Sequence, residues 1–200
     1  MAGRHVKHAL KMDEKTLNRN YIYRGKIINL RVDTVRLPNR RQASREIVEH
    51  PGAVAIVPVL DNGRIVLVKQ FRKPVEKALL EIPAGKLEKD EPAKDCASRE
   101  LEEETGFRAK HLNLLLSFYP SPGFSDECIH VFKATGLSSG KMEQQSDEFI
   151  ERVLLDPSEI LSMIKAGQIT DAKTIIGLAS CGLIGQHPGA ATPGLPQNLT

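Results

Sequence analysis

The chain has 200 residues, a formal net charge of +3, 4% aromatic residues and no tryptophan. This length and the ordinary hydrophobic content suit one compact domain with an additional arm or tail, able to bury a core without disulfides or structural metals. The small positive charge and the scarcity of aromatic side chains argue against nucleic-acid binding and against platforms that stack single-stranded bases.

Cysteine spacing and apolar runs indicate the compartment. Cys96, Cys128 and Cys181 are widely spaced and odd in number, so no disulfide framework and no cysteine metal site is predicted. The basic first ten residues lack a continuous apolar core, and the longest apolar runs are far shorter than a bilayer span. We therefore expect a cytoplasmic protein without membrane contact.

The first third of the chain predicts β structure. Residues 1–18 are polar and are expected to form a loose lead-in, while residues 21–39 and 44–50 alternate as strands or a hairpin do. Residues 52–60 are almost continuously apolar and end at the turn signal Asp-Asn-Gly. This turn predicts a hairpin in which residues 64–71 form the partner strand, with the register left open by Pro58.

The rest of the chain alternates strands with helices. Pro92, the helix-forming residues 93–105 and then Gly106 predict a helix with a defined start and stop. Further strands are expected over 111–119, 127–136 and 150–155, a flexible acidic loop over 138–149, and helices over 156–167 and 171–184. Strands before and after one charged helix predict an α/β fold with a mixed sheet flanked by helices.

Three glutamates crowd one side of the helix predicted over residues 93–105. At 100° per residue, Glu100 and Glu104 lie beside the stripe that faces the core, and Glu103 lies just beyond them. Each like-charged pair at these spacings costs roughly 0.2–0.5 kcal/mol, and Arg99 offsets part of this repulsion. A hard divalent cation such as Mg²⁺, shared between carboxylates and substrate phosphates, is the natural neutraliser of the remainder.

The charged stretch also follows a longer pattern, G-x5-E-x7-R-E-U-x-E-E-x-G-U, in which U is a bulky apolar residue. The matching positions are Gly85, Glu91, Arg99, Glu100, Leu101, Glu103, Glu104, Gly106 and Phe107. This string resembles the Nudix box. The resemblance implies an α/β/α sandwich and hydrolysis of a nucleoside diphosphate linked to another moiety, in which water attacks phosphorus with the help of Mg²⁺ or Mn²⁺.

The resemblance also implies roles within the box. Glu100 and Glu104 correspond to the main metal carboxylates, with Glu103 assisting, and Arg99 corresponds to an arginine that holds a glutamate in place. In the subgroup named next, the backbone carbonyl that here belongs to Ala84 also binds metal. Glu91 is left open between a helix-start or outer residue and a direct metal ligand.

Residues 45–175 carry a finer resemblance. Pro122 follows Phe107 by fifteen residues in an S-P-G-x-S-x-E setting, which resembles the ADP-ribose pyrophosphatase subgroup. The resemblance implies a homodimer whose N-terminal strands cross to the partner and help to build the site. The substrate-binding residues that it implies are Arg72, Glu81, Glu46, His50, Pro122 and Ser125.

Several of these roles have alternatives. Arg72 suits a diphosphate or ribose hydroxyls, or it is a rim arginine at a strand end, and Glu81 faces either the adenosine end or a second metal. Glu148 matches a loop glutamate proposed as the catalytic base in some relatives, whereas others use a box glutamate. A loop carboxylate that is merely solvated is the competing account of Glu148.

Together these expectations define a domain plan and a reaction. Residues 1–44 form a lead-in and β arm used in dimerisation, residues 45–185 the Nudix domain and residues 186–200 a disordered tail. The predicted reaction is Mg²⁺-dependent hydrolysis of ADP-ribose to AMP and ribose 5-phosphate, with Mn²⁺ as a substitute. The alternatives are a broader nucleotide-sugar or dinucleotide pyrophosphohydrolase and a non-catalytic module that senses ADP-ribose. The complete box argues against the sensor, because a protein that only binds ADP-ribose does not need every metal carboxylate.

Overall fold

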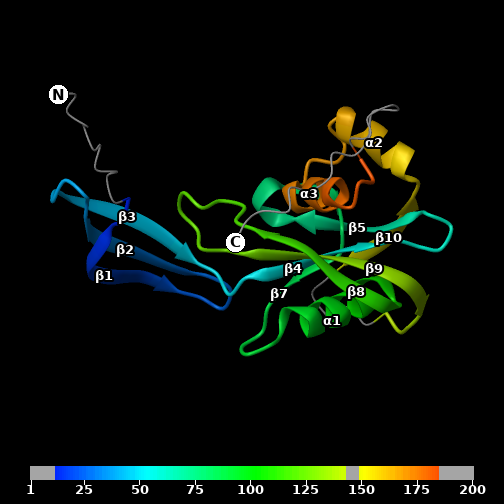
Figure 1. Cartoon of the computed structure of the whole chain (residues 1–200), viewed down its shortest axis with the longest axis horizontal. Helices are drawn as coiled ribbons and strands as arrows, with labels where there is room; N and C mark the ends of the chain where they lie inside the picture. Colours follow the sequence, from blue (N-terminus) through cyan, green and yellow to red (C-terminus); the bar gives the residue numbers. More distant parts are fainter. Residues whose placement is uncertain (1–11, 143–148, 185–200) are drawn as a thin grey trace, which may run out of the picture. The chain divides into compact units, whose positions relative to one another are not determined.

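The computed structural model describes residues 12–142 and 149–184 (Figure 1). Contacts among the described residues divide them into two compact units, of which the first contains residues 12–52 and 119–128 and the second contains residues 53–118, 129–142 and 149–184. Within the described ranges, no helix is both long enough and apolar enough to cross a bilayer.

The first unit is a three-stranded antiparallel sheet in the order β1-β2-β3, with β1 at Lys15–Arg24, β2 at Asn29–Arg36 and β3 at Gln42–Glu49. The hairpin expected within residues 21–39 is confirmed. The loose lead-in expected through residue 18 is wrong, because Lys15 already pairs with Arg36. Nearly every side chain of this edge strand is exposed, so its sequence carries no apolar alternation that would have indicated a strand.

The second unit contains two sheets. The mixed sheet has the order β7-β4-β9-β8, in which β4 runs parallel to β9 and antiparallel to β7. The other sheet is antiparallel and has the order β10-β5-β6. The strands are β4 Ala53–Pro58, β5 Ile65–Arg72, β6 Lys77–Glu81, β7 Ala84–Lys86, β8 Phe107–Phe118, β9 Ile129–Ser139 and β10 Ile150–Leu155, with a 3-10 turn at Lys73–Val75.

The predicted pairing of residues 52–60 with residues 64–71 is wrong. The turn forms where expected, with the Leu60 N–H donating to the Arg64 carbonyl at 2.9 Å and a single bridge between Val59 and Ile65. Beyond that bridge the two strands enter different sheets, because β7 and β9 occupy both edges of β4. A turn signal fixes the reversal of the chain, but the competition for strand edges is decided by residues far away in sequence.

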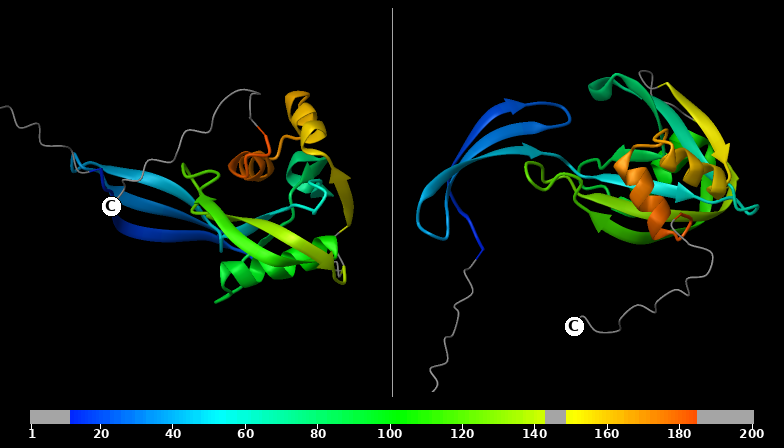
Figure 2. Two further views of the ribbon diagram at one scale, coloured as in Figure 1. Left: turned by 45° about the vertical axis from the view of Figure 1, so that its right-hand side comes forward. Right: turned by 90° about the horizontal axis from the view of Figure 1, so that it is seen from above.

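Helices cover both faces of the mixed sheet (Figures 1 and 2). α1 (Ala93–Thr105) packs on one face against Val54 and Ile56, whereas Ala55 and Val57 point into the other cluster with α2 (Pro157–Lys165) and α3 (Ala172–Ser180). Because alternate β4 side chains enter two cores, its sequence is apolar throughout. The predicted α/β/α sandwich with a mixed sheet is confirmed.

Gly177 allows α3 to approach the mixed sheet closely. A Cβ placed there would lie 2.9 Å from Ile82 Cδ1, 3.1 Å from Val57 Cγ2 and 3.4 Å from Val131 Cγ1. We expect Gly177→Ala to lower the free energy of unfolding by about 1–2 kcal/mol, since overpacking outweighs the gain in helix propensity. Urea denaturation measures the change, and a gain of about 1 kcal/mol, as at an exposed helix position, would contradict the packing described.

Candidate active site

The C-terminal end of α1 is fixed by residues outside its apolar face. Gly106 has a φ of 70°, a left-handed conformation that suits glycine, and its N–H bonds to the Glu102 carbonyl at 2.8 Å. Arg152 of β10 donates to the Thr105 carbonyl at 2.7 Å and stacks over the Phe107 ring at 4.9 Å. A cation beside the last carbonyls of a helix also interacts favourably with the negative end of the helix dipole. The predicted limits of this helix are confirmed.

Glu100 and Glu104 are nearly buried, with 6% and 4% of their surface exposed. The Glu100 carboxylate lies directly over Gly85 of β7, where an added Cβ would come within 2.0 Å of its Cδ and Oε1. The Ala84 N–H donates to Glu104 Oε2 at 3.1 Å. The box glycine is therefore the residue that leaves room for a carboxylate between helix and strand.

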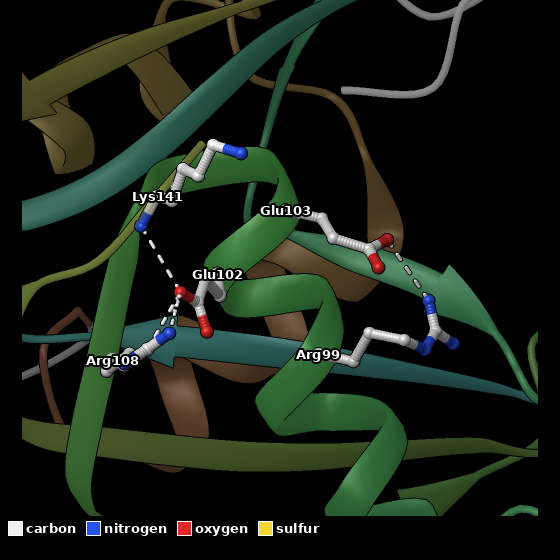
Figure 3. A pocket seen from close by; sticks show the side chains of 5 residues that line it. All are labelled: Arg99, Glu102, Glu103, Arg108 and Lys141. Atoms are coloured by element: carbon white, nitrogen blue, oxygen red, sulfur yellow. Dashed lines mark hydrogen bonds and ion pairs between the residues drawn. The ribbon is translucent and has the colours of Figure 1, made fainter. Parts of the chain in front are cut away.

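Arg99 links three glutamates. Its Nε and Nη2 donate to the two carboxylate oxygens of Glu91, each at 3.0 Å, and its Nη1 donates to Glu100 at 2.7 Å and to Glu103 at 3.2 Å. Figure 3 shows the Arg99–Glu103 contact. The role that the resemblance implies for Arg99, holding glutamates in place, agrees with these contacts, and Glu91 is the partner that it binds with two hydrogen bonds.

These contacts predict an acid-dependent contribution to stability. The hydrogen bonds from Arg99 lower the pKa of Glu91 to about 2, with burial opposing them. Because the folded-state pKa lies below the ordinary value, this contribution is complete above the unfolded pKa and is lost as pH falls toward 2. We expect Glu91→Gln to lower the free energy of unfolding by about 1 kcal/mol at neutral pH.

Chemical denaturation at pH 7 and at pH 3 measures this difference. The loss caused by Glu91→Gln should shrink at the lower pH, because the wild-type carboxylate is then closer to its own protonation. Glu88→Gln, at an exposed position on the same loop, should change stability by less than about 0.5 kcal/mol at either pH. A Glu91→Gln loss of equal size at both pH values would contradict the assignment.

The neighbouring carboxylate of α1, Glu102, has a different set of partners. Glu102 accepts from Arg108 Nε at 2.8 Å and from the Lys141 backbone N–H at 3.2 Å. These residues, with Arg99 and Glu103, line a pocket of about 240 Å³ (Figure 3). Glu102 thus anchors the chain that follows β9, away from the carboxylates that contact β7.

The residues of the box fit a divalent cation in their chemistry. Glu100 and Glu104 are carboxylates one helical turn apart, nearly buried, and Glu100 rests in a cradle that a Cβ would fill. Oxygen-only donors of this kind suit Mg²⁺ or Mn²⁺. Between residues 12 and 142 and from 149 to 184, however, no three His, Cys, Asp or Glu side chains are grouped as a metal site. Arg99 instead draws Glu103 and one oxygen of Glu100 toward itself.

Arg72 and Glu81 belong to a second cluster in the same unit. Arg72 donates through Nε and Nη2 to the two oxygens of Glu81, both at 2.8 Å, and Lys173 also contacts Glu81. Burial alone would raise the pKa of Glu81, but the Arg72 hydrogen bonds and the Lys173 charge hold it below its ordinary value. Hydrogen bonding to Glu81 raises the pKa of Arg72, and the charge of Glu104 is among the further causes. Arg72 is therefore within electrostatic reach of the box.

Four predicted substrate residues belong to the first unit. The His50 N–H donates to Asp126 at 2.8 Å, and the hydroxyl of Ser125 accepts from the Glu127 N–H at 3.2 Å. Ser125 forms a bridge with Val48, next to the end of β3. The structure therefore brings His50 together with the loop of Ser125, while Glu46 on β3 and Pro122 in that loop are both exposed. Their substrate contacts stay predictions.

Two residues of the Arg72 cluster were missed by the sequence analysis. Lys173 and Asp171 fall within the helix predicted over residues 171–184, but neither was assigned a role, although two charges at the start of an otherwise apolar helix were a usable signal. The predicted base Glu148 lies outside the described residues, as does the tail at 186–200. The three cysteines are unpaired with one another, as expected.

The fold is an α/β/α sandwich in which the Glu100 carboxylate of α1 packs against Gly85 of β7. Comparison with protein families identifies the class of hydrolase that has this arrangement. Residues 49–176 match the NUDIX domain family, and residues 14–48 match the nucleoside diphosphate sugar hydrolase N-terminal domain. The chain belongs to the Nudix family. The predicted domain limits at residues 44 and 185 stay predictions.

Two relatives and one solved structure show which proteins this chain resembles. The chain is 50% identical to an ADP-ribose pyrophosphatase of Bacillus subtilis, covering 82% of this chain and 89% of that protein. It is 46% identical to a methanol dehydrogenase activator of Bacillus methanolicus, covering 83% and 91%. A crystal structure of an ADP compounds hydrolase matches with a TM-score of 0.77 at 21% identity, covering 87% of this chain and 94% of that one, and so supports the fold.

Proposed function

We propose that this protein hydrolyses the pyrophosphate of ADP-ribose to AMP and ribose 5-phosphate, with Mg²⁺ as the cofactor and Mn²⁺ as a substitute. The observation that carries the proposal is the pair of nearly buried box carboxylates, Glu100 and Glu104, with the arginine Arg72 in electrostatic reach. The 50% identity to a protein named for this activity supports the choice of substrate.

The contacts of the box residues support the following roles. Glu100, Glu104 and the Ala84 carbonyl would hold the cation, which supplies charge neutralisation at the phosphates and lowers the pKa of a bound water. Arg99 keeps Glu100 and Glu103 oriented through its guanidinium. Arg72 offers planar, paired donors to phosphate oxygens, so that binding energy positions the diphosphate for in-line attack.

Incubation with ADP-ribose and Mg²⁺ tests the proposal. We expect AMP and ribose 5-phosphate in equal amounts, and no turnover when a chelator removes the metal. Hydrolysis in ¹⁸O-water should place one heavy oxygen in one of the two products. Folded protein that yields no AMP above background would contradict the proposal.

A broader pyrophosphohydrolase is the second candidate, because the chain is also 37% identical, over 68% of its length, to a Yersinia enterocolitica protein named GDP-mannose pyrophosphatase. Comparing kcat/KM for ADP-ribose, GDP-mannose and NAD⁺ separates the two candidates, since specificity is a difference in transition-state binding. If kcat/KM for ADP-ribose exceeds the other values by less than about 10-fold, which corresponds to about 1.4 kcal/mol, the broader enzyme is favoured. Tight ADP-ribose binding without any turnover would favour a sensor.

We also propose a homodimer formed through the β1–β3 sheet. Among the described residues of that unit, Val35 is the one buried apolar side chain, while Leu17, Ile22, Tyr23, Ile27 and Ile28 are exposed. A three-stranded sheet needs a covered apolar face to be stable. Sedimentation equilibrium should give twice the chain mass, and Ile22→Asp with Ile27→Asp should shift it toward the monomer.

A further inference from the structure

Arg72, the predicted substrate-binding arginine, is held by two hydrogen bonds to a buried carboxylate, Glu81. Glu81 is 1% exposed, and both of its oxygens accept from Arg72, whose side chain is 36% exposed. A guanidinium bound side-on through Nε and Nη2 has its plane fixed and its Nη1 edge directed away from the carboxylate. Such an arginine is oriented for a second acceptor before any ligand arrives.

A second cation binds the same carboxylate. Lys173, with its side chain 15% exposed, contacts Glu81 Oε2, the oxygen that also accepts from Arg72 Nη2. One buried carboxylate thus contacts two cations, and Asp171, which lies 3.0 Å from Lys173 Nζ, brings the formal charges of these four side chains into balance. The contact of Lys173 with Oε2 fixes the carboxylate that orients Arg72, so the exposed edge of the guanidinium is held in one direction for an anionic ligand.

The position of Lys173 is itself fixed from the N-terminus of α3. Its Nζ lies 3.0 Å from Asp171 Oδ1, while Asp171 Oδ2 accepts from the Thr174 N–H at 2.9 Å and from the Thr174 hydroxyl at 2.6 Å. Thr174 is fully buried, and its hydroxyl accepts from the Ile82 N–H at 2.8 Å, next to Glu81. These hydrogen bonds join the N-terminus of α3 to the end of β6, where Glu81 lies.

We infer that Lys173 is a positioning residue for diphosphate binding, acting through Glu81 to orient Arg72, with Asp171 holding Lys173 in place. This inference rests on the proposed function, because it takes the diphosphate of the substrate as the ligand of Arg72. It assigns Glu81 to this internal network and gives the α3 N-terminus a part in ligand affinity.

The test is a double-mutant cycle on ligand binding. Dissociation constants for inorganic pyrophosphate with Mg²⁺, and for α,β-methylene ADP-ribose, are measured by calorimetry in the wild type and in Lys173→Met, Glu81→Gln and the double variant. We expect Lys173→Met to raise both constants by about 5- to 30-fold. In the Glu81→Gln background the same change should add less than about 2-fold, since the carboxylate through which it acts is gone.

Two controls separate positioning from a purely structural role. Lys173→Arg, which keeps the charge, should bind both ligands within about 3-fold of the wild type. Thermal unfolding of each variant reports stability independently of affinity. If Lys173→Met does not fold, Lys173→Gln, which keeps a polar end without the charge, takes its place in the cycle.

Unchanged pyrophosphate affinity in the neutral Lys173 variant, with or without a lower Tm, would overturn the inference. So would an equal effect of Lys173→Met in the wild-type and Glu81→Gln backgrounds. If pyrophosphate binding shows the expected coupling but the ADP-ribose analogue does not bind, the inference stands and the proposed substrate fails. The two proposals therefore fail in distinguishable ways.

Discussion

Glu104→Gln is expected to lower kcat/KM for ADP-ribose by about 10³-fold, the largest loss of any single substitution in the box. The charge of Glu104 lies on a nearly buried side chain one turn from Glu100, where a divalent cation would be shared. Losing that charge removes several kcal/mol of transition-state stabilisation. The amide keeps an oxygen that can accept from the Ala84 N–H, so the fold should persist.

Glu102→Gln is the matched control for this prediction. It makes the same chemical change on the same helix, but Glu102 contacts Arg108 and the Lys141 backbone. Its kcat/KM should stay within about 3-fold of the wild type, since it lies outside the metal-binding set. Steady-state kinetics with both variants at saturating Mg²⁺ decides the matter, and equal losses in the two variants would contradict the assignment of roles along α1.

Gly85→Ala is expected to have the second-largest effect, a loss of about 10²-fold in kcat with little change in secondary structure. Its Cβ would lie 2.0 Å from the carboxyl carbon and from Oε1 of Glu100, so the carboxylate must move away from β7. A displacement of about 1 Å in a group that positions reacting atoms costs on the order of 10²-fold in rate.

Gly63→Ala tests whether this loss is specific. Gly63 has a φ of 84° and open space around it, so alanine there strains the turn without touching the site. We expect Gly63→Ala to reduce stability by about 1 kcal/mol while leaving kcat unchanged. Kinetics combined with urea denaturation separates the two effects. Full activity of Gly85→Ala would show that Glu100 does not need its present position.

Local signals in the sequence were enough to predict the box helix. Its limits follow from Pro92 and Gly106, and the seam positions of Glu100 and Glu104 follow from 100° per residue. The pattern also identified Gly85, but the physical reason for that glycine, a carboxylate resting on its α-carbon, became visible only in the structure.

Features that depend on distant residues could not be predicted in this way. β4 and β5 carry a clear turn signal between them, yet β9 and β7 take the edges of β4. β1 begins within a polar segment because backbone pairing with β2, and not burial, defines it. The contact between Lys173 and Glu81 joins residues 92 positions apart, so no local pattern contains it.

The most direct test of the central claim is a crystal structure with Mn²⁺ and α,β-methylene ADP-ribose, with the metal located by its anomalous scattering. The account predicts an anomalous peak about 2.1–2.3 Å from carboxylate oxygens of Glu100 and Glu104 and next to the bound diphosphate. A bound analogue with no metal at these two glutamates would contradict the claim that the crowded acids of α1 exist to hold a cation.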